Sequence, residues 1–257
     1  MVEVTLKMYL LICPLVVLAG FVDSVAGGGG LISLPAYIIA GVPIHFAAGT
    51  NKMANSFGTA MATIQFSKGG YVRFKPALAA AAGAFIGGAA GSRIVLMLSA
   101  EAVQILVMVC LPFAAIFMLT RKNLGGDVDN IVEPKKEYIR GFFIGIGVGI
   151  YDGVFGPGTG TFLIMFFTAL LGYSMITASA NAKVVNLASN IGALLAYTLG
   201  GKVSFTLGIP CMLCSCLGNY IGSKMAIKKG SKFIRPVMMM VIAMLFLKII
   251  YDFTLGK

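Results

Sequence analysis

Residues 21–32 read Phe-Val-Asp-Ser-Val-Ala-Gly-Gly-Gly-Gly-Leu-Ile, and apolar sequence runs up to this stretch from Met8 and on from it to Ala40. Four consecutive glycines predict a break in a helix, because each glycine costs roughly 1 kcal/mol relative to alanine in a helix interior. A break at membrane depth frees backbone N–H and C=O groups that lipid cannot satisfy, so it must be buried in protein or line a watery cavity. Many transporters build their substrate sites from such interrupted helices.

The same pattern recurs later in the chain, where residues 149–162 read Gly-Ile-Tyr-Asp-Gly-Val-Phe-Gly-Pro-Gly-Thr-Gly-Thr-Phe. Asp152 corresponds to Asp23, and Gly156-Pro157-Gly158 corresponds to the start of the glycine run. Two broken segments at matching places in two halves of a chain predict a transport site between them.

The composition is that of a polytopic membrane protein. The chain has 257 residues, of which 58% are hydrophobic and 11% charged, and its mean hydropathy is +0.93. Several apolar runs reach the roughly 20 residues that a membrane-spanning helix needs. We expect the first run to be retained as part of the protein, because no small-x-small cleavage site of a signal peptide follows Lys7. The net charge of +11 does not indicate a nucleic-acid partner, because most cations lie in short loops between predicted spans.

The chain divides into two transmembrane repeats, residues 1–120 and 138–257, joined by a charged cytoplasmic linker at 121–137. We expect an all-α fold in which each repeat contains a glycine-broken re-entrant hairpin and three transmembrane helices, with two short helices flanking the break in the first hairpin. The hairpins are predicted at 8–45 and 138–172, and the spans at 46–67, 76–98, 101–119, 174–199, 205–223 and 236–253. The halves also match locally, since Gly69-Gly70-Tyr-Val-Arg-Phe corresponds to Gly200-Gly201-Lys-Val-Ser-Phe.

The basic residues predict the orientation of the two repeats. The loops 68–75, 121–140 and 224–235 hold 13 of the 20 lysines and arginines, so we place all three in the cytoplasm. This is possible only if each hairpin enters and leaves on one face and each half crosses the membrane an odd number of times. The repeats are therefore predicted to have inverted topology, with both termini in the periplasm. The sequence leaves the oligomeric state open, a homodimer included.

Lys52 and Lys183 occupy matching positions inside predicted spans, where a lysine costs roughly 2.5–3.5 kcal/mol even on lenient insertion scales. Our hypothesis is that they attract a small anion to a site at the repeat interface near the bilayer midplane, in a carrier that works by alternating access. Amide donors are expected from Asn51, Asn55, Asn181, Asn186 and Asn190. Backbone donors at the helix N-termini after the breaks are expected from Gly28, Gly29, Gly30, Gly158, Thr159 and Gly160.

Other interpretations of these charges remain open. Each lysine lies about two turns into its span and can extend its ammonium group to the interface. Alternatively, Asp23 pairs with Lys52, and Asp152 with Lys183, as structural ion pairs. The two aspartates either carry a coupling proton or cap helices at the breaks. We favour capping, because an aspartate followed closely by a glycine turn can satisfy free N–H groups.

No enzyme signature is present. The chain has no Walker phosphate loop, no His-Glu-x-x-His motif and no Ser/His/Asp set, so we expect no catalytic residue, metal or cofactor. Cys211-x-x-Cys214-x-Cys216 is the strongest candidate for metal or redox chemistry, but no histidine or carboxylate lies near enough in sequence to complete a site. We therefore favour small packing residues in a membrane helix. Two alternatives stay open: an anion channel, and a membrane enzyme or scaffold subunit that uses these cysteines.

Four motifs resemble those of the TauE/SafE sulfite exporter family, also called the toluene sulfonate uptake permease family. They are Gly20-Phe-Val-Asp-Ser-Val-Ala-Gly-Gly-Gly-Gly-Leu-Ile, Gly49-Thr-Asn-Lys, Tyr151-Asp-Gly-Val-Phe-Gly-Pro-Gly-Thr-Gly and Ser189-Asn-Ile-Gly. The resemblance covers nearly the whole chain. It implies secondary transport of sulfite, sulfonates, sulfoacetate or related sulfur-containing anions across a bacterial inner membrane.

Overall fold

The computed structural model describes residues 4–99, 101–103, 105 and 128–254, and this part of the chain folds into helices with no strand. The predicted all-α fold is confirmed. Most of the predicted span 101–119, and residues 121–127 of the predicted linker, lie outside the described residues. The helices are α1 (Leu6–Ala26), α2 (Gly30–Ile39), α3 (Ile44–Lys68), α4 (Phe74–Met97), α6 (Pro134–Val154), α7 (Thr159–Phe166) with a π-helical continuation (Phe167–Leu171), α8 (Met175–Leu199), α9 (Phe205–Lys229) and α10 (Ser231–Thr254).

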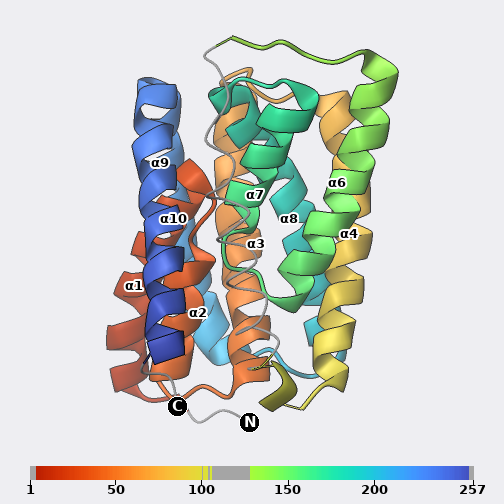
Figure 1. The fold of residues 1–257 in the computed structure, drawn as a ribbon. Coiled ribbons are helices and arrows are strands. Elements are labelled where there is room, and N and C mark those ends of the chain that lie inside the picture. Colours follow the sequence, from red (N-terminus) through yellow and green to blue (C-terminus); the bar gives the residue numbers. More distant parts are fainter. Residues whose placement is uncertain (1–3, 100, 104, 106–127, 255–257) are drawn as a thin grey trace.

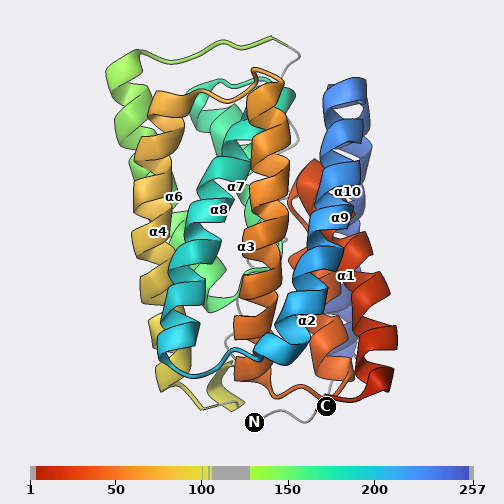
Figure 2. The same ribbon diagram turned by 180° about the vertical axis from the view of Figure 1, so that it is seen from behind.

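The first glycine break forms the tip of a hairpin made by α1 and α2, whose open ends lie at the same end of the bundle (Figures 1 and 2). Gly27 ends α1 with φ +80°, a left-handed conformation that favours glycine, and its N–H donates to Asp23 O at 2.7 Å. The arms are unequal, since α1 has 21 residues and α2 has 10. The prediction of two short helices is wrong for α1, because its hydrogen bonding continues past Asp23 to the first glycine.

The second break forms a hairpin from α6 and α7 that enters from the opposite end of the bundle (Figure 1). The tips of the two hairpins touch. Gly160 N donates to Gly27 O at 3.2 Å, and Thr161 Oγ1 donates to Ala26 O at 2.7 Å. A Cβ atom on Gly27 would lie 2.2 Å from the backbone of Gly160, so this approach requires glycine.

The basic turns gather at one end of the bundle. The α3–α4 turn, the start of α6 with Lys135 and Lys136, and the α9–α10 turn lie at the same end, whereas α1 begins and α10 finishes at the other end (Figures 1 and 2). One feature is repeated at each end: Arg73 N donates to Asn181 Oδ1 at 3.1 Å, and Ser204 N, from the matching loop, donates to Thr50 Oγ1 at 3.0 Å. These directions agree with antiparallel halves. The inverted repeat itself stays a prediction, because the last helix of the first half falls outside the described residues.

Small residues allow helices of the two halves to pack closely. A Cβ atom on Gly145 of α6 would lie 2.0 Å from Ala80 O of α4, and one on Gly218 of α9 would lie 2.0 Å from Val17 O of α1. The long arm of each hairpin thus packs against a helix of the other half, as small-residue spacing favours in lipid. Among the described helices, α1, α4 and α9 are long and apolar enough to cross a bilayer.

Candidate functional site

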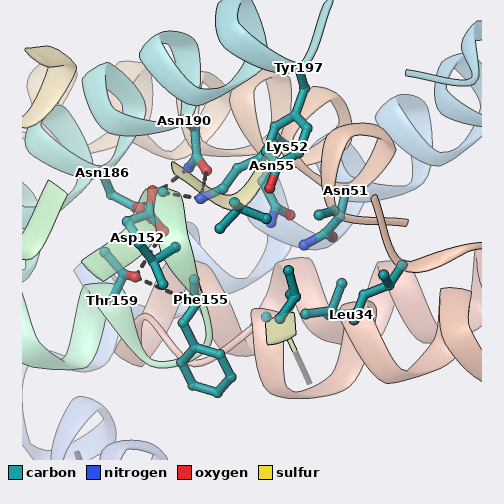
Figure 3. Close-up of a pocket in the computed structure, with 18 of the residues that line it drawn as sticks. Leu34, Asn51, Lys52, Asn55, Asp152, Phe155, Thr159, Asn186, Asn190 and Tyr197 are labelled. Atoms are coloured by element: carbon teal, nitrogen blue, oxygen red, sulfur yellow. Dashed lines mark hydrogen bonds and ion pairs between the residues drawn. The ribbon is translucent and has the colours of Figure 1, made fainter. Parts of the chain in front are cut away.

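The site forms where α3 and α8 pass the two hairpin tips. α3 contributes Asn51, Lys52 and Asn55, and α8 contributes Asn186 and Asn190. These side chains face a cavity rather than lipid (Figure 3). Both helices have 25 residues. They carry these polar groups on the side that faces the cavity.

Lys52 is the centre of a buried polar network. Its Nζ lies 2.6 Å from Asp152 Oδ2 and donates to Asn190 Oδ1 at 3.1 Å (Figure 3). Only 6% of Lys52 and 3% of Asp152 is exposed. Thr159 Oγ1 donates to Asp152 Oδ1 at 2.8 Å, and Ser189 Oγ donates to Asp152 Oδ2 at 2.6 Å. Asp152 therefore holds three donors from α3, α7 and α8, which fixes it at the tip of the second hairpin.

Lys183 forms the second buried pair. Its Nζ lies 3.3 Å from Asp23 Oδ2 and also donates to Asp23 O. No part of the Lys183 side chain is exposed. The pair joins the C-terminal part of α1 to α8, near the tip of the first hairpin, whereas the Lys52 network holds the tip of the second.

These contacts decide between the interpretations of the charges. Each lysine pairs with the aspartate of the other half, so the alternative that pairs Asp23 with Lys52 and Asp152 with Lys183 is wrong. The partners are exchanged because the hairpins enter from opposite ends and meet tip to tip. Neither ammonium group extends to the bundle surface. Neither α2 nor α7 has a side-chain cap, so the preferred capping role of the aspartates is not seen.

A small cavity opens beside Lys52, with a volume of about 40 Å³. By the same measure one water needs about 10–15 Å³, so the space suits a few waters or one small anion. It extends past Ala48 to Ile44 and His45 at the start of α3, the end of the bundle opposite the basic turns. Its polar lining residues are Asp23, His45, Asn51, Lys52, Asn55, Asp152, Thr159, Asn186, Asn190 and Tyr197.

Of the predicted backbone donors, Gly30 and Thr159 line the cavity, whereas Gly28, Gly29, Gly158 and Gly160 do not, and neither does the amide of Asn181. Asn181 instead binds the α3–α4 turn and donates to Thr177 O at 2.7 Å. Gly28 faces Val241 of α10, and Gly29 packs on Ala19. The N–H groups of Thr159 and Gly160 donate to Gly156 O and Gly27 O, and Gly158 precedes α7 with φ +83°. Lys183 also lies outside the residues that line the cavity.

Sequence reasoning missed two contributors to this site. Ser189 binds Asp152 directly, and Tyr197 lines the cavity. A usable signal existed for Ser189: it lies three residues after Asn186, so the two fall on one face of a helix.

A second network, also missed, closes the end that carries the basic turns. Arg73 donates from Nε to Glu137 Oε1 at 2.8 Å and from Nη2 to Glu137 Oε2 at 3.1 Å, and Tyr173 OH donates to Oε1. The side chain of Glu137 is 3% exposed and that of Arg73 is 40% exposed. Burial, and then the bond to Glu137, raises the pKa of Tyr173, so its phenol stays a donor. The bond to Glu137 likewise raises the pKa of Arg73.

The comparisons with known proteins agree on one family. The family model described as "Sulfite exporter TauE/SafE" matches residues 12–249. The chain belongs to the TauE/SafE family. It is 34% identical over 237 residues to "Probable membrane transporter protein ORF9" of Sinorhizobium sp, covering 91% of this chain and 89% of the relative.

Other TauE/SafE relatives carry similar names. "Probable membrane transporter protein YfcA" of Escherichia coli K12 is 35% identical, with 91% of this chain and 87% of the relative covered. A "Probable membrane transporter protein" of Haemophilus influenzae is 33% identical, with 91% of each chain covered. No solved structure matches the chain. The chain is thus a membrane transporter and not an enzyme, as the motifs predicted.

Proposed function

We propose that this transporter is a secondary carrier of small anions, that sulfite and simple sulfonates are its substrate class, and that Lys52 binds the anion. The observation that carries the proposal is a buried ammonium group at the wall of a cavity near the meeting point of two hairpins. Charged residues inside membrane proteins generally mark the path of a substrate or ion. The family description, a sulfite exporter, supports the substrate class.

The cavity offers further donors to an anion. An ammonium group has three N–H donors, and Asp152 and Asn190 account for two of those of Lys52. Asn51 lines the cavity, and its Oδ1 is buried without a hydrogen-bond partner. A buried amide with unmet bonding calls for a partner, and turning the amide over would present its NH₂ group to an anion. Asn55 adds a second amide on the same helix.

The geometry supports alternating access. The cavity reaches Lys52 from the end opposite the basic turns, whereas Lys183 is sealed on all sides. We place the basic turns in the cytoplasm of a bacterial cell, by the positive-inside rule, and the termini in the periplasm. We therefore assign this arrangement to an outward-facing state of the proposed cycle. Opening the Arg73–Glu137 end would give the inward-facing state.

Purified protein in liposomes tests this proposal. Uptake of radiolabelled sulfite should saturate, and unlabelled sulfite trapped inside should accelerate it. Lys52→Gln should lower the exchange rate at least about tenfold, since a charge-assisted bond contributes about 1.5–3 kcal/mol. Lys202→Gln is the matched control, because Lys202 lies in a loop over the ring of Phe46.

The variant Lys52→Gln/Asp152→Asn separates binding from folding, because it removes the ammonium group without leaving a buried carboxylate alone. It should fold and should still not exchange sulfite. Equal rates in the Lys52 and Lys202 variants would refute the site. A flux that neither saturates nor responds to internal sulfite would indicate a channel.

A further inference from the structure

We propose that Asp152 takes up one proton when an anion binds Lys52, so that the carrier moves a proton together with each anion. This inference rests on the proposed function and specifies the second ion of the same site. It follows from the charges that surround the cavity and from the hydrogen bonds of one carboxylate.

The buried charges of the site balance before an anion enters. Lys52 neutralises Asp152, and Lys183 neutralises Asp23. A monovalent anion beside Lys52 would leave the buried site with one uncompensated negative charge, which a low-dielectric surrounding strongly disfavours. Protonation of Asp152 restores neutrality and frees the ammonium group for the anion.

The hydrogen-bond partners of Asp152 suit both a carboxylate and a protonated carboxyl group. Both of its oxygens accept from hydroxyl groups, Oδ1 from Thr159 and Oδ2 from Ser189. A hydroxyl group can turn from donor to acceptor, so a protonated carboxyl can donate to the oxygen of Ser189 or Thr159 without moving. Lys52 meanwhile keeps Asn190 Oδ1 at 3.1 Å.

The neighbouring groups single out Asp152 among the described residues. Lys52 and Asn55 face it from α3, Thr159 from α7, and Ser189, Asn190 and Tyr197 from α8. On α4, Ser92 is bonded to Gly153 O and carries no charge.

Other titratable groups at the cavity are less suited. Asp23 is held by the fully buried Lys183. His45 sits nearer the mouth, with Nε2 3.3 Å from Val95 O. The proton therefore enters with water from the open end, binds an oxygen of Asp152, and leaves after the anion is released at the other end.

Calorimetric titration of the purified full chain with sodium methanesulfonate tests the inference, because the charge of this anion is independent of pH. Titrations in phosphate and in Tris, which have different ionisation enthalpies, give the number of protons taken up on binding. We expect about one proton per anion for the wild type and for Glu133→Gln, which removes an exposed carboxylate outside the cavity, and none for Asp152→Asn. The Kd of the wild type should also rise about tenfold per pH unit once free Asp152 is ionised.

The outcomes separate the two proposals. If neither methanesulfonate nor sulfite binds the wild type, the proposed function fails. If methanesulfonate binds with no proton uptake and a Kd independent of pH, only the proton inference fails. It also fails if a thermally stable Asp152→Asn variant still takes up a proton. The wild-type pH dependence decides the matter should Asp152→Asn not fold.

Discussion

Replacing Gly27 by alanine tests whether contact between the hairpin tips holds the site together. The new Cβ atom would lie 2.2 Å from Cα and C of Gly160 and 2.5 Å from Thr161 N. No flexible side chain is available to move away, since every one of these atoms is backbone. The tips must separate, which breaks the bond from Gly160 N to Gly27 O at 3.2 Å.

The expected loss of stability is the sum of three effects. Alanine at φ +80° is strained by about 1–2 kcal/mol. Overpacking adds about 1–3 kcal/mol, and the lost hydrogen bond about 1 kcal/mol. Together they give roughly 3–6 kcal/mol. For a chain of this length about 2–4 °C of Tm corresponds to 1 kcal/mol, so the Tm should fall by at least about 6 °C.

Gly41→Ala is the control, because Gly41 has φ +86° but no atom within 4 Å of its Cβ position. It should lose only the conformational strain of about 1–2 kcal/mol. The chain has no tryptophan but five cysteines, so unfolding is best followed with a thiol-reactive fluorophore in detergent. An equal fall in Tm for both variants would mean that the two hairpin tips are not in close steric contact, and the description of the site would be wrong.

Three further predictions concern other parts of the bundle. Arg73→Gln should lower the Tm more than Glu137→Gln. The first variant leaves the Glu137 carboxylate buried without its cation, whereas the second leaves only a half-exposed guanidinium group. The reverse order of Tm values would contradict the role of this pair in closing that end of the bundle. Gly145→Ala should reduce the yield of monodisperse protein, whereas Gly147→Ala, with no atom near its Cβ position, should not; size-exclusion profiles compare them. Replacing Cys211, Cys214 and Cys216 together by alanine should leave sulfite exchange within about twofold of wild type, since small core truncations cost mainly stability; complete loss in a folded variant would favour the enzyme or scaffold alternative.

The local signals of this sequence predicted local features well. Glycine runs predicted both helix breaks, since few residues penalise a helix as glycine does. Intramembrane charge pointed to Lys52 and Asp152, because burying charge without a purpose is costly. The length of α1 could not be predicted, because the helix tolerates Asp23 when Lys183 of a distant helix pairs with it.

Features that depend on tertiary arrangement were not predictable. Which aspartate meets which lysine follows from two hairpins entering at opposite ends, and no spacing within one half encodes it. Asn181 precedes the cavity-lining Asn190 by nine residues, which is about 180° around a helix, so it faces the α3–α4 turn instead of the cavity. Arg73 and Glu137 lie in sequence that predicts only membrane orientation, yet they bind each other across the bundle.

The central claim, that Lys52 receives the anion, is tested most directly by locating a bound anion. Crystals of the protein soaked with selenite, a heavier analogue of sulfite, would show the anion by its anomalous scattering. We predict a selenium peak in the cavity with an oxygen about 2.7–3.2 Å from Lys52 Nζ, and its loss in Lys52→Gln/Asp152→Asn. Peaks confined to the basic turns, or an unchanged cavity peak in that variant, would contradict the account.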